Sequence, residues 1–378
     1  MRPFSRGKTV KAIKACVISL GSTSSKWTIA EMKKYFEEVE GFSLYDMGIK
    51  VDGRAIEVLH KGKPMKQYDC VYVKGSFRFA LLARAITAKI MNESYSPYSP
   101  TSYTLAHDKM LTHIQLEQFN IPMPQTYLTP SIESARALLK EITYPIVIKF
   151  PQGTGGKGVL FADSYASASS MLDALEILNQ PFIIQQYLDV DGKDTRCIVV
   201  GDKVVAAYQR VAAPREERAN IHAGGVGAPH TPNPVTKRIA VKTAKAIGAE
   251  IVGVDILETS RGPYVIEVNI SPGLQGVTKT TKVNVAECIA QHLFKRTKEF
   301  CEQRKKKQSQ QIIQGMGIGS GHEGFQDLIT TVDVRGDRIL LPDIVSKVSK
   351  LSQEETVVIK VKEGAVHIER FVVEEKKK

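Results

Sequence analysis

The chain of 378 residues is longer than one ordinary hydrophobic core supports, which predicts two or three domains. Hydrophobic residues make up 43% of it and charged residues 24%, as is typical of globular proteins, and no apolar run is long enough to span a membrane. The formal net charge of +12 favours anionic partners such as nucleotides, acidic substrates or nucleic acid, without deciding among them.

The cysteines are scattered along the chain and lack the spacing of a metal site; they are Cys16, Cys70, Cys197, Cys288 and Cys301. The basic segment 1–14 lacks the apolar core of a secretion signal. Together these features favour a reducing cytoplasm as the compartment.

The first hundred residues alternate predicted strands and helices, which is typical of a small α/β domain. Apolar patterning predicts strands over 14–20 and 68–75 and helices over 27–40 and 78–92. Lys74 follows the second strand, at a strand end where α/β sheets often bind ligands, although an ordinary surface charge explains it equally well.

Two lysines in the next segment suggest a bound anion. Lys109 lies in the first turn of a predicted helix over 107–120, whose roughly helical apolar stripe consists of Met110, Ile114, Leu116 and Phe119. Lys149 lies inside a predicted strand, YPIVIKF. A lysine between apolar residues of a buried strand needs an acidic or phosphate partner.

A glycine-rich loop, GTGGKG at 153–158, follows Lys149 directly. It matches the GxGxxG pattern of dinucleotide folds, but that fold needs a helix next, and the chain continues with a strand, VLFAD. A loop between two antiparallel strands can instead close over phosphates with its backbone N–H groups. An ordinary flexible hairpin remains the alternative for the loop alone, and Lys149 shifts the balance toward phosphate binding.

The segment after the loop offers groups for a nucleotide. A predicted strand ends in the polar hinge Gln185-Gln186-Tyr187-Leu188, which suits the edge of an adenine ring. A hairpin turning at 201–202 follows; Asp194 and Arg196 open it and Arg210 closes it. The stretch 215–229 then carries Arg218, Asn220 and His222, of which the first two suit a transferring phosphoryl group unless they are ordinary surface residues.

The hairpin predicted within 251–276 carries three oxygen-bearing side chains on otherwise apolar strands, Asp255, Glu267 and Asn269. With a turn near Arg261, Asp255 lies opposite Glu267, and Asn269 shares the face of Glu267. Two facing carboxylates repel each other unless a positive charge lies between them. Carboxylate and amide oxygens favour a hard cation, best Mg²⁺, although exposed positions on a one-sided strand remain the alternative.

These features occur in a fixed order: Lys109, Lys149, GTGGKG, IIQQYL, DTRCIVVGDKVVAA, RANIHAGG, GVDIL and EVNISPGLQGVTKTT. In this order they resemble the ATP-grasp ligases, most closely the RimK-like branch, over about residues 14–295. The resemblance implies an α/β (α+β) fold with an N-terminal Rossmann-like domain (1–100), a flap subdomain (101–190) and a C-terminal Mg²⁺/ATP and substrate subdomain (191–297).

The resemblance also implies a role for each matching residue. ATP and Mg²⁺ are the cofactors it implies, with Mn²⁺ as a substitute for Mg²⁺. The residues expected to bind the nucleotide are Lys109, Lys149, Gly153, Gly155, Gly156, Gly158, Gln186, Tyr187, Asp194, Arg218 and Asn220. Those expected to act on the transferring phosphoryl group are Arg210, Arg218 and Asn220, and the metal ligands are Asp255, Glu267 and Asn269. The hinge departs from the family's usual Gln-Glu by having Gln186, which predicts altered nucleotide contacts.

The remaining chain is expected to form a basic helix and linker over 298–326 and a small β-rich module over 327–378. The module resembles the AbrB-type swapped hairpin, which implies association into a homo-oligomer, a dimer or tetramer. A stretch this short builds little core without a partner copy.

Two functions from different classes follow from these residues. The first is an ATP-dependent carboxylate–amine ligase that forms an acylphosphate and adds an amino acid, glutamate first, to a protein, coenzyme or polyglutamate acceptor. The second is a DNA-binding regulator that acts through the C-terminal module, with the ligase core sensing nucleotide. The agreement of lysines, arginines and metal ligands favours the enzyme and makes nucleic acid the less favoured partner.

Overall fold

The computed structural model describes residues 12–53, 55–129, 131–151, 158–178, 181–211, 226–315, 333–336, 338–340, 345, 349–351, 355–362 and 365–370. They belong to two compact units, Met1–Gln303 and Arg304–Lys378, and each unit is described by itself. The mixed α/β class expected from the sequence is confirmed. The finer division at residues 100, 190, 297 and 326 stays a prediction.

The N-terminal part of the larger unit contains a parallel sheet in the order β2-β1-β6. Its strands are β1 (Lys14–Ser19), β2 (Glu38–Ser43) and β6 (Cys70–Val73), and α1 (Thr23–Met32) and α2 (Ala80–Ile90) accompany it. The Ser22 hydroxyl caps α1 by accepting a hydrogen bond from the Ser25 N–H, as the serine run suggested. The prediction of helix over 27–40 was wrong at its end, because residues 38–40 pair with β1 instead.

A small antiparallel sheet and two short helices complete this part. Its strands are β3 (Met47–Val51), β4 (Ile56–His60) and β5 (Lys63–Pro64), and the 3₁₀ helices are η1 (Leu44–Asp46) and η2 (Phe77–Phe79). The connection to the next sheet is helical, through α3 (Ser102–His107) and α4 (Lys109–Gln118).

An antiparallel sheet in the order β7-β10-β8-β9 has a hydrophobic core of its own. Its strands are β7 (Thr126–Leu128), β8 (Ile146–Lys149), β9 (Val159–Ala162) and β10 (Ile183–Gln186), and α5 (Ile132–Glu141) and α6 (Tyr165–Leu178) are its helices. β8 and β9 pair antiparallel on either side of the glycine loop, as the strand after the glycines predicted. This pairing contradicts the dinucleotide fold, which needs a helix there.

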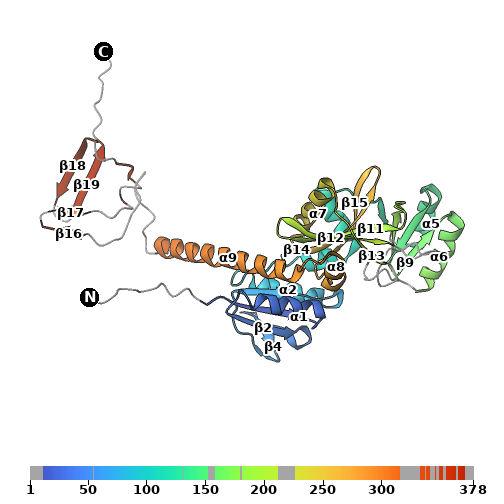
Figure 1. Cartoon of the computed structure of the whole chain (residues 1–378), viewed down its shortest axis with the longest axis horizontal. Helices are drawn as coiled ribbons and strands as arrows, with labels where there is room; N and C mark the ends of the chain where they lie inside the picture. The colour runs from blue at the N-terminus through green and yellow to red at the C-terminus, as the bar shows by residue number, and fades with distance from the viewer. Residues whose placement is uncertain are drawn as a thin grey trace, which may run out of the picture. The chain divides into compact units, whose positions relative to one another are not determined.

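The sheet that carries the site has five antiparallel strands in the order β13-β12-β11-β14-β15. They are β11 (Lys193–Val200), β12 (Lys203–Val211), β13 (Val226–Pro229), β14 (Ile251–Thr259) and β15 (Gly262–Asn269). Helix α7 (Pro234–Ile247) packs on four of them, and α8 (Leu274–Thr281) contacts β12 and β13 (Figure 1). Helix α7 ends at Gly248 with φ 72°, where a side chain would collide with Ser99.

The last elements are a long helix and two β-pairs. Helix α9 runs from Val285 to Gly315, and Ile289 and Leu293 of its first turns join the core of the larger unit. In the smaller unit, β16 (Asp333–Arg335) pairs with β17 (Arg338–Leu340), and β18 (Val357–Lys362) pairs with β19 (Ala365–Arg370), both antiparallel. The resemblance of this unit to a swapped hairpin stays a prediction. Among the described residues, no helix is long and apolar enough to cross a membrane.

Candidate nucleotide and metal site

The hairpin β14–β15 places the three predicted metal ligands at one end of the five-stranded sheet. Asp255 lies directly opposite Glu267, as expected, and Asn269 lies opposite Gly253. A β-bulge follows the Asp255–Glu267 pair at once. Bulges bend a strand and re-aim its side chains, and they are common next to active sites.

Two arginines from neighbouring strands hold Asp255, whose side chain is only 1% exposed. Arg196 of β11 donates from Nε and Nη2 to the two carboxylate oxygens, at 2.6 and 2.5 Å. Arg210 of β12 donates from Nη2 to Oδ2 of Asp255 at 2.7 Å and makes a bidentate pair with Asp194 at 2.5 and 2.6 Å. The positive charge that facing carboxylates require is therefore partly supplied by the protein.

The carboxylates of this cluster differ in how well their charge is compensated. Burial alone would raise the pKa of Asp255, but Arg196 and Arg210 overcome it and hold that pKa at about 2. Burial and the nearby Asp255 raise the pKa of Glu267, which Lys109 only partly offsets. Burial likewise raises the pKa of Asp194, to about 6, against the pull of Arg210. Of the two facing carboxylates, Glu267 is the one that still needs a cation.

Lys149, the lysine of the buried strand, faces the same region from the other sheet. Its Nζ donates to the Gln185 side-chain oxygen at 2.6 Å. Burial lowers its pKa to about 8, while Glu267 raises it and Lys109 lowers it. These mutual effects place Lys109, Lys149 and Glu267 within electrostatic reach of one another. The sequence predicted both lysines for this site, and a phosphate chain is the partner that suits them.

Gln185 fixes Lys149, a task that the sequence did not predict. Its side chain is 2% exposed, and its amide nitrogen donates to Thr126 Oγ1 at 2.8 Å and lies 3.2 Å from His113 Nε2. Burial lowers the pKa of His113 to about 4, so this imidazole is neutral at pH 7. The signal available in the sequence was the position of Gln185 on a buried strand, where an amide needs partners.

The hinge residues follow β10. The Gln186 N–H donates to the Gln125 carbonyl at 2.8 Å, and its side chain points to solvent. The Tyr187 N–H donates to the Pro145 carbonyl at 3.3 Å, and its ring packs edge-on against Phe161 at 5.1 Å. Their contact with adenine stays a prediction.

Several predicted site residues lie outside the described part of the chain, namely Gly153, Gly155, Gly156, Arg218 and Asn220. Gly158 is described at the start of β9, with φ 75°, and a side chain there would overlap the Phe150 ring. A glycine is therefore required where the loop rejoins its strand. The phosphate-binding roles of these residues stay predictions.

The donor set is compatible with Mg²⁺ when phosphates complete it. The Glu267 side chain makes no hydrogen bond within the described residues, and Asn269 has a buried amide nitrogen without a partner. Asp255 keeps lone-pair capacity beyond its three hydrogen bonds, because a carboxylate accepts about four. No group of three or more His, Cys, Asp or Glu side chains among the described residues forms a metal site. Two carboxylates and an amide suit Mg²⁺, which takes few protein ligands and the rest from phosphates and water.

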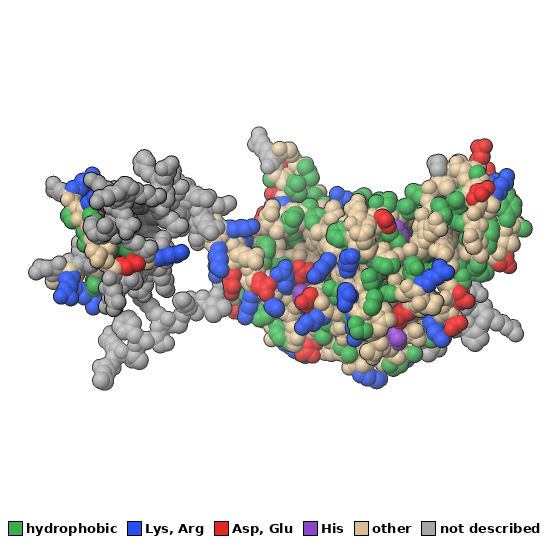
Figure 2. Space-filling model, turned by 90° about the horizontal axis from the view of Figure 1, so that it is seen from above, with side chains coloured by type: hydrophobic (Ala, Val, Ile, Leu, Met, Phe, Trp, Pro, Cys, Tyr) green, Lys and Arg blue, Asp and Glu red, His purple; other side chains and the backbone are tan. Residues whose placement is uncertain are grey.

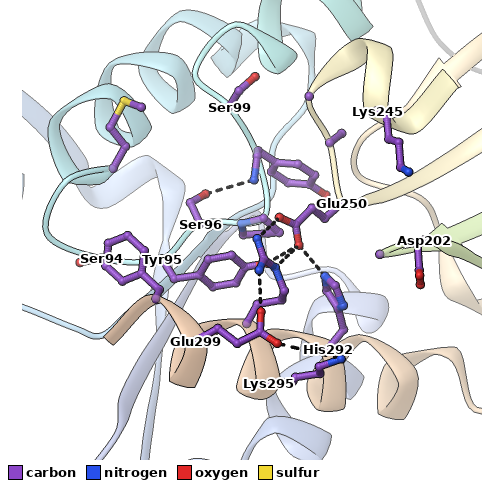
Figure 3. A pocket seen from close by; sticks show the side chains of 18 of the residues that line it. Ser94, Tyr95, Ser96, Ser99, Asp202, Lys245, Glu250, His292, Lys295 and Glu299 are labelled. Atoms are coloured by element: carbon purple, nitrogen blue, oxygen red, sulfur yellow. Dashed lines mark hydrogen bonds and ion pairs between the residues drawn. The ribbon is translucent and has the colours of Figure 1, made fainter. Parts of the chain in front are cut away.

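A cavity of about 770 Å³ lies elsewhere, beside the turn that joins β11 to β12 (Figure 3). Glu250 at its wall contacts Tyr95 at 2.7 Å, His292 at 2.6 Å and Arg296 at 3.1 Å. Burial would raise the pKa of Glu250, but His292 and Arg296 hold it at about 2. These groups satisfy one another and tie α9 to the sheet, which accounts for the charge of Glu250 without a ligand.

Residues 106–293 match the model of the RimK-like ATP-grasp domain. The chain is also 35% identical over 257 residues to the ribosomal protein bS6–L-glutamate ligase of Salmonella schwarzengrund, covering 67% of this chain and 86% of that protein. The chain belongs to the RimK-like ATP-grasp family. It is accordingly an ATP-dependent carboxylate–amine ligase, as the sequence predicted, and this family works with ATP and Mg²⁺.

Two solved structures share the fold of this RimK-like chain at low sequence identity. The RimK domain ATP-grasp protein from Sphaerobacter thermophilus aligns with a TM-score of 0.58 and 19% identity, over 74% of this chain and 99% of that one. The ATP-grasp ligase PsnB, in complex with its minimal precursor, Mg and ADP, aligns with a TM-score of 0.58 and 18% identity, over 75% of this chain and 98% of that one. At these identities the likeness supports the fold.

Proposed function

We propose that this ligase adds L-glutamate to a carboxylate of a protein acceptor. The observation that carries the proposal is the incompletely compensated carboxylate Glu267 within electrostatic reach of Lys109 and Lys149, a charge arrangement that a metal-bound phosphate chain completes. Glutamate as the amine, and a protein as the acceptor, are supported by the similarity to the bS6–L-glutamate ligase over 86% of its length.

The chemistry follows from the charges of the reactants. A carboxylate oxygen of the acceptor attacks the γ-phosphorus of ATP, ADP leaves, and an acylphosphate forms. The amine of glutamate then attacks the acyl carbon, inorganic phosphate leaves, and the amide loses a proton. Mg²⁺, when bound, supplies positive charge against the phosphate oxygens. No protein nucleophile is needed in this sequence of steps.

Each described residue has a task in this proposal. Lys109 and Lys149 neutralise the phosphates of ATP, and Gln185 keeps the Lys149 ammonium in place. Glu267 and Asn269, with Asp255, hold the metal. The Arg196 and Arg210 contacts keep Asp255 ionised and oriented. Arg210 already donates to both carboxylate oxygens of Asp194. Asp194 can therefore contact the nucleotide only while it stays paired with Arg210.

The partners and compartment extend the proposal. We also propose that the protein works in the cytoplasm, because all five cysteines are free thiols. We propose that it forms a homo-oligomer, because the C-terminal unit resembles a swapped hairpin. On the face shown in Figure 2, basic side chains of the larger unit are interspersed with acidic ones. This face therefore lacks the continuous basic stripe that a long nucleic-acid track needs. Mg²⁺ is the metal of this proposal, and Mn²⁺ is proposed as a substitute for it.

A labelling experiment tests the substrates. The protein is incubated with ATP, Mg²⁺, isotope-labelled L-glutamate and a cell extract from which nucleotides and amino acids were removed, and proteins are analysed by mass spectrometry. We expect labelled glutamate on a protein acceptor, dependent on ATP and absent with Glu267→Gln. ADP release with a different amino acid, and none with glutamate, would reject glutamate. Label on small molecules only would reject a protein acceptor.

A further inference from the structure

Strand β6 is followed directly by a lysine whose ammonium group is buried without a partner among the described residues. Lys74 is 4% exposed, and its Nζ makes no hydrogen bond among the described residues. The Nζ atom of Lys74 lies over the Tyr72 ring, 5.6 Å from the ring centroid. A cation–π contact of this kind compensates only part of the hydration that an ammonium group loses on burial.

The surroundings of Lys74 give this charge no structural purpose. Burial lowers its pKa to about 8, and no acidic group among the described residues opposes that shift. A buried Lys or Glu is ordinarily paired, because an isolated buried charge destabilises the folded chain. An apolar side chain of similar length, such as methionine, would fill the same space at lower cost. A buried cation without a protein counter-charge is therefore suited to a bound anion.

The chain places Lys74 beside the segment that follows the metal ligands. The N–H of Gly75, the next residue, donates to Ser271 Oγ at 3.2 Å. Farther along this segment, the Leu274 N–H donates to Ser24 Oγ of α1 at 2.8 Å. The end of β6 and the segment after β15 therefore meet, although 196 residues separate Gly75 from Ser271 in the sequence.

The unsatisfied groups near this junction are donors. Besides the Lys74 ammonium, the Asn269 amide nitrogen is buried without a partner, two residues before Ser271. Unpaired donors complement an acceptor-only group, and a carboxylate is the acceptor-only group of an amino acid. The signs of the charges therefore favour a substrate carboxylate at this junction.

Lys74 is electrostatically separate from the phosphate lysines. The pKa of Lys149 responds to Glu267 and Lys109, and the pKa of Lys74 responds to burial alone. The carboxylate that becomes activated must lie by the phosphates, where Lys109 and Lys149 are. The anion at Lys74 is therefore a different carboxylate, one that is never phosphorylated.

We propose that Lys74 binds a carboxylate of the incoming amino acid and so selects an acidic α-amino acid as the amine substrate. This proposal rests on the proposed function. Entry requires the lysine side chain to rotate out of its contact with Tyr72, which its four-carbon stem allows. The ammonium then exchanges a weak aromatic contact for an ion pair at the edge of the reaction site.

Kinetics of two variants test the proposal, with wild type and Lys63→Met, an exposed lysine of the same part, as controls. In Lys74→Met we expect the KM for L-glutamate to rise on the order of 10- to 100-fold, as for the loss of a charged hydrogen bond, and the KM for ATP to change by less than about twofold. Lys74→Arg keeps the charge and should recover part of the loss. Lys63→Met should match wild type in both constants.

Thermal unfolding supplies a readout that does not require turnover. Saturating L-glutamate with a non-hydrolysable ATP analogue and Mg²⁺ should raise the Tm of wild type above that with the analogue alone, and should not do so for Lys74→Met. Without ligands, Lys74→Met should be at least as stable as wild type, because it removes a buried charge.

The outcomes separate the two claims. If none of the amino acids tested supports ADP release by wild type, the proposed function fails. If wild type uses glutamate and Lys74→Met has the same KM for it, the role of Lys74 is wrong. A Lys74→Met protein that does not fold would show that the ammonium is structural, which also overturns the proposal.

Discussion

Arg196 donates two parallel hydrogen bonds to Asp255, from Nε to Oδ1 at 2.6 Å and from Nη2 to Oδ2 at 2.5 Å. The two residues lie opposite each other on β11 and β14. A planar guanidinium matched to a carboxylate fixes the orientation of both groups. This pair makes Asp255 part of the framework of the site as well as a proposed metal ligand, whereas Glu267 has no such partner among the described residues.

The variants Asp255→Asn and Glu267→Gln should therefore separate stability from activity. Both should abolish ligation, because each removes a proposed metal ligand. Asp255→Asn should also lower the free energy of unfolding by about 3 kcal/mol, because it leaves two buried guanidiniums undercompensated. Glu267→Gln should leave that free energy unchanged or higher. Urea unfolding and ADP release measure the two effects, and the exposed turn residue Asp202→Asn is the control. Equal stability losses in both variants would contradict the account.

The orientation of Asp255 predicts a metal phenotype for Arg196→Lys. A lysine keeps the charge but cannot form the bidentate pair, so Asp255 is held less firmly. We expect the Mg²⁺ concentration for half-maximal ADP release to rise about 10- to 100-fold, the usual effect of disturbing a group that orients a metal ligand. The exposed Arg238→Lys on α7 should behave as wild type. An unchanged Mg²⁺ requirement in Arg196→Lys would show that this pair does not serve the metal.

Gln185 should matter for nucleotide affinity. Gln185→Leu removes the acceptor of Lys149 and leaves that ammonium free to move, so we expect the KM for ATP to rise about tenfold, as for the loss of one charged hydrogen bond. The KM for glutamate should stay near the wild-type value. The exposed Gln303→Leu is the matched control. A rise in the KM for glutamate instead would move Gln185 from the phosphate side to the amino-acid side.

The pKa of Lys149, lowered to about 8 by burial, predicts a pH profile. The protonated form attracts phosphate, so kcat/KM for ATP at saturating glutamate should fall as the pH rises through about 8. Lys149→Arg stays charged, and its profile should remain level over that range whatever its absolute rate. Parallel declines in both proteins would assign the titration to another group.

The elements that the sequence predicted well are those with strong local signals. The hairpin β14–β15 turns where the polar ETSRG interrupts two apolar runs, and Asp255 lies opposite Glu267 as predicted, with the register shifting at a β-bulge directly after this pair. The glycine loop was assigned between antiparallel strands because an apolar strand pattern follows it. Lys149 was recognised because a charged side chain on a buried strand needs an acidic or phosphate partner.

The elements that the sequence missed depend on contacts far apart in the chain. Residues 38–40 have helix-compatible composition and form β2 because the backbone of β1 is available to pair with them. Of the predicted apolar stripe of α4, Leu116 is buried, whereas Ile114 and Phe119 are 48% and 40% exposed, and the polar His113 is buried against Gln185. Local hydrophobicity therefore identified part of the buried face but not His113, whose partner Gln185 lies 72 residues farther along the chain.

The arginine partner of Asp255 was missed for the same reason. The sequence placed Arg196 and Arg210 at the ends of a hairpin, and the resemblance assigned Arg210 to the transferring phosphoryl group. No local pattern tells which carboxylate a strand arginine will meet. Strand order supplies that information, because β11 lies between β12 and β14 and brings both guanidiniums to Asp255.

An oxygen-transfer measurement tests the central claim, that ATP activates a carboxylate for attack by an amine. The acceptor identified by labelling is prepared with ¹⁸O in its carboxylate and incubated with ATP, Mg²⁺ and glutamate. The account predicts that the released inorganic phosphate carries one ¹⁸O for each amide formed. The bridging oxygen of the acylphosphate comes from the acceptor carboxylate, and it leaves with the phosphate when the amine attacks the acyl carbon. Label in AMP, or unlabelled phosphate despite amide formation, would contradict it.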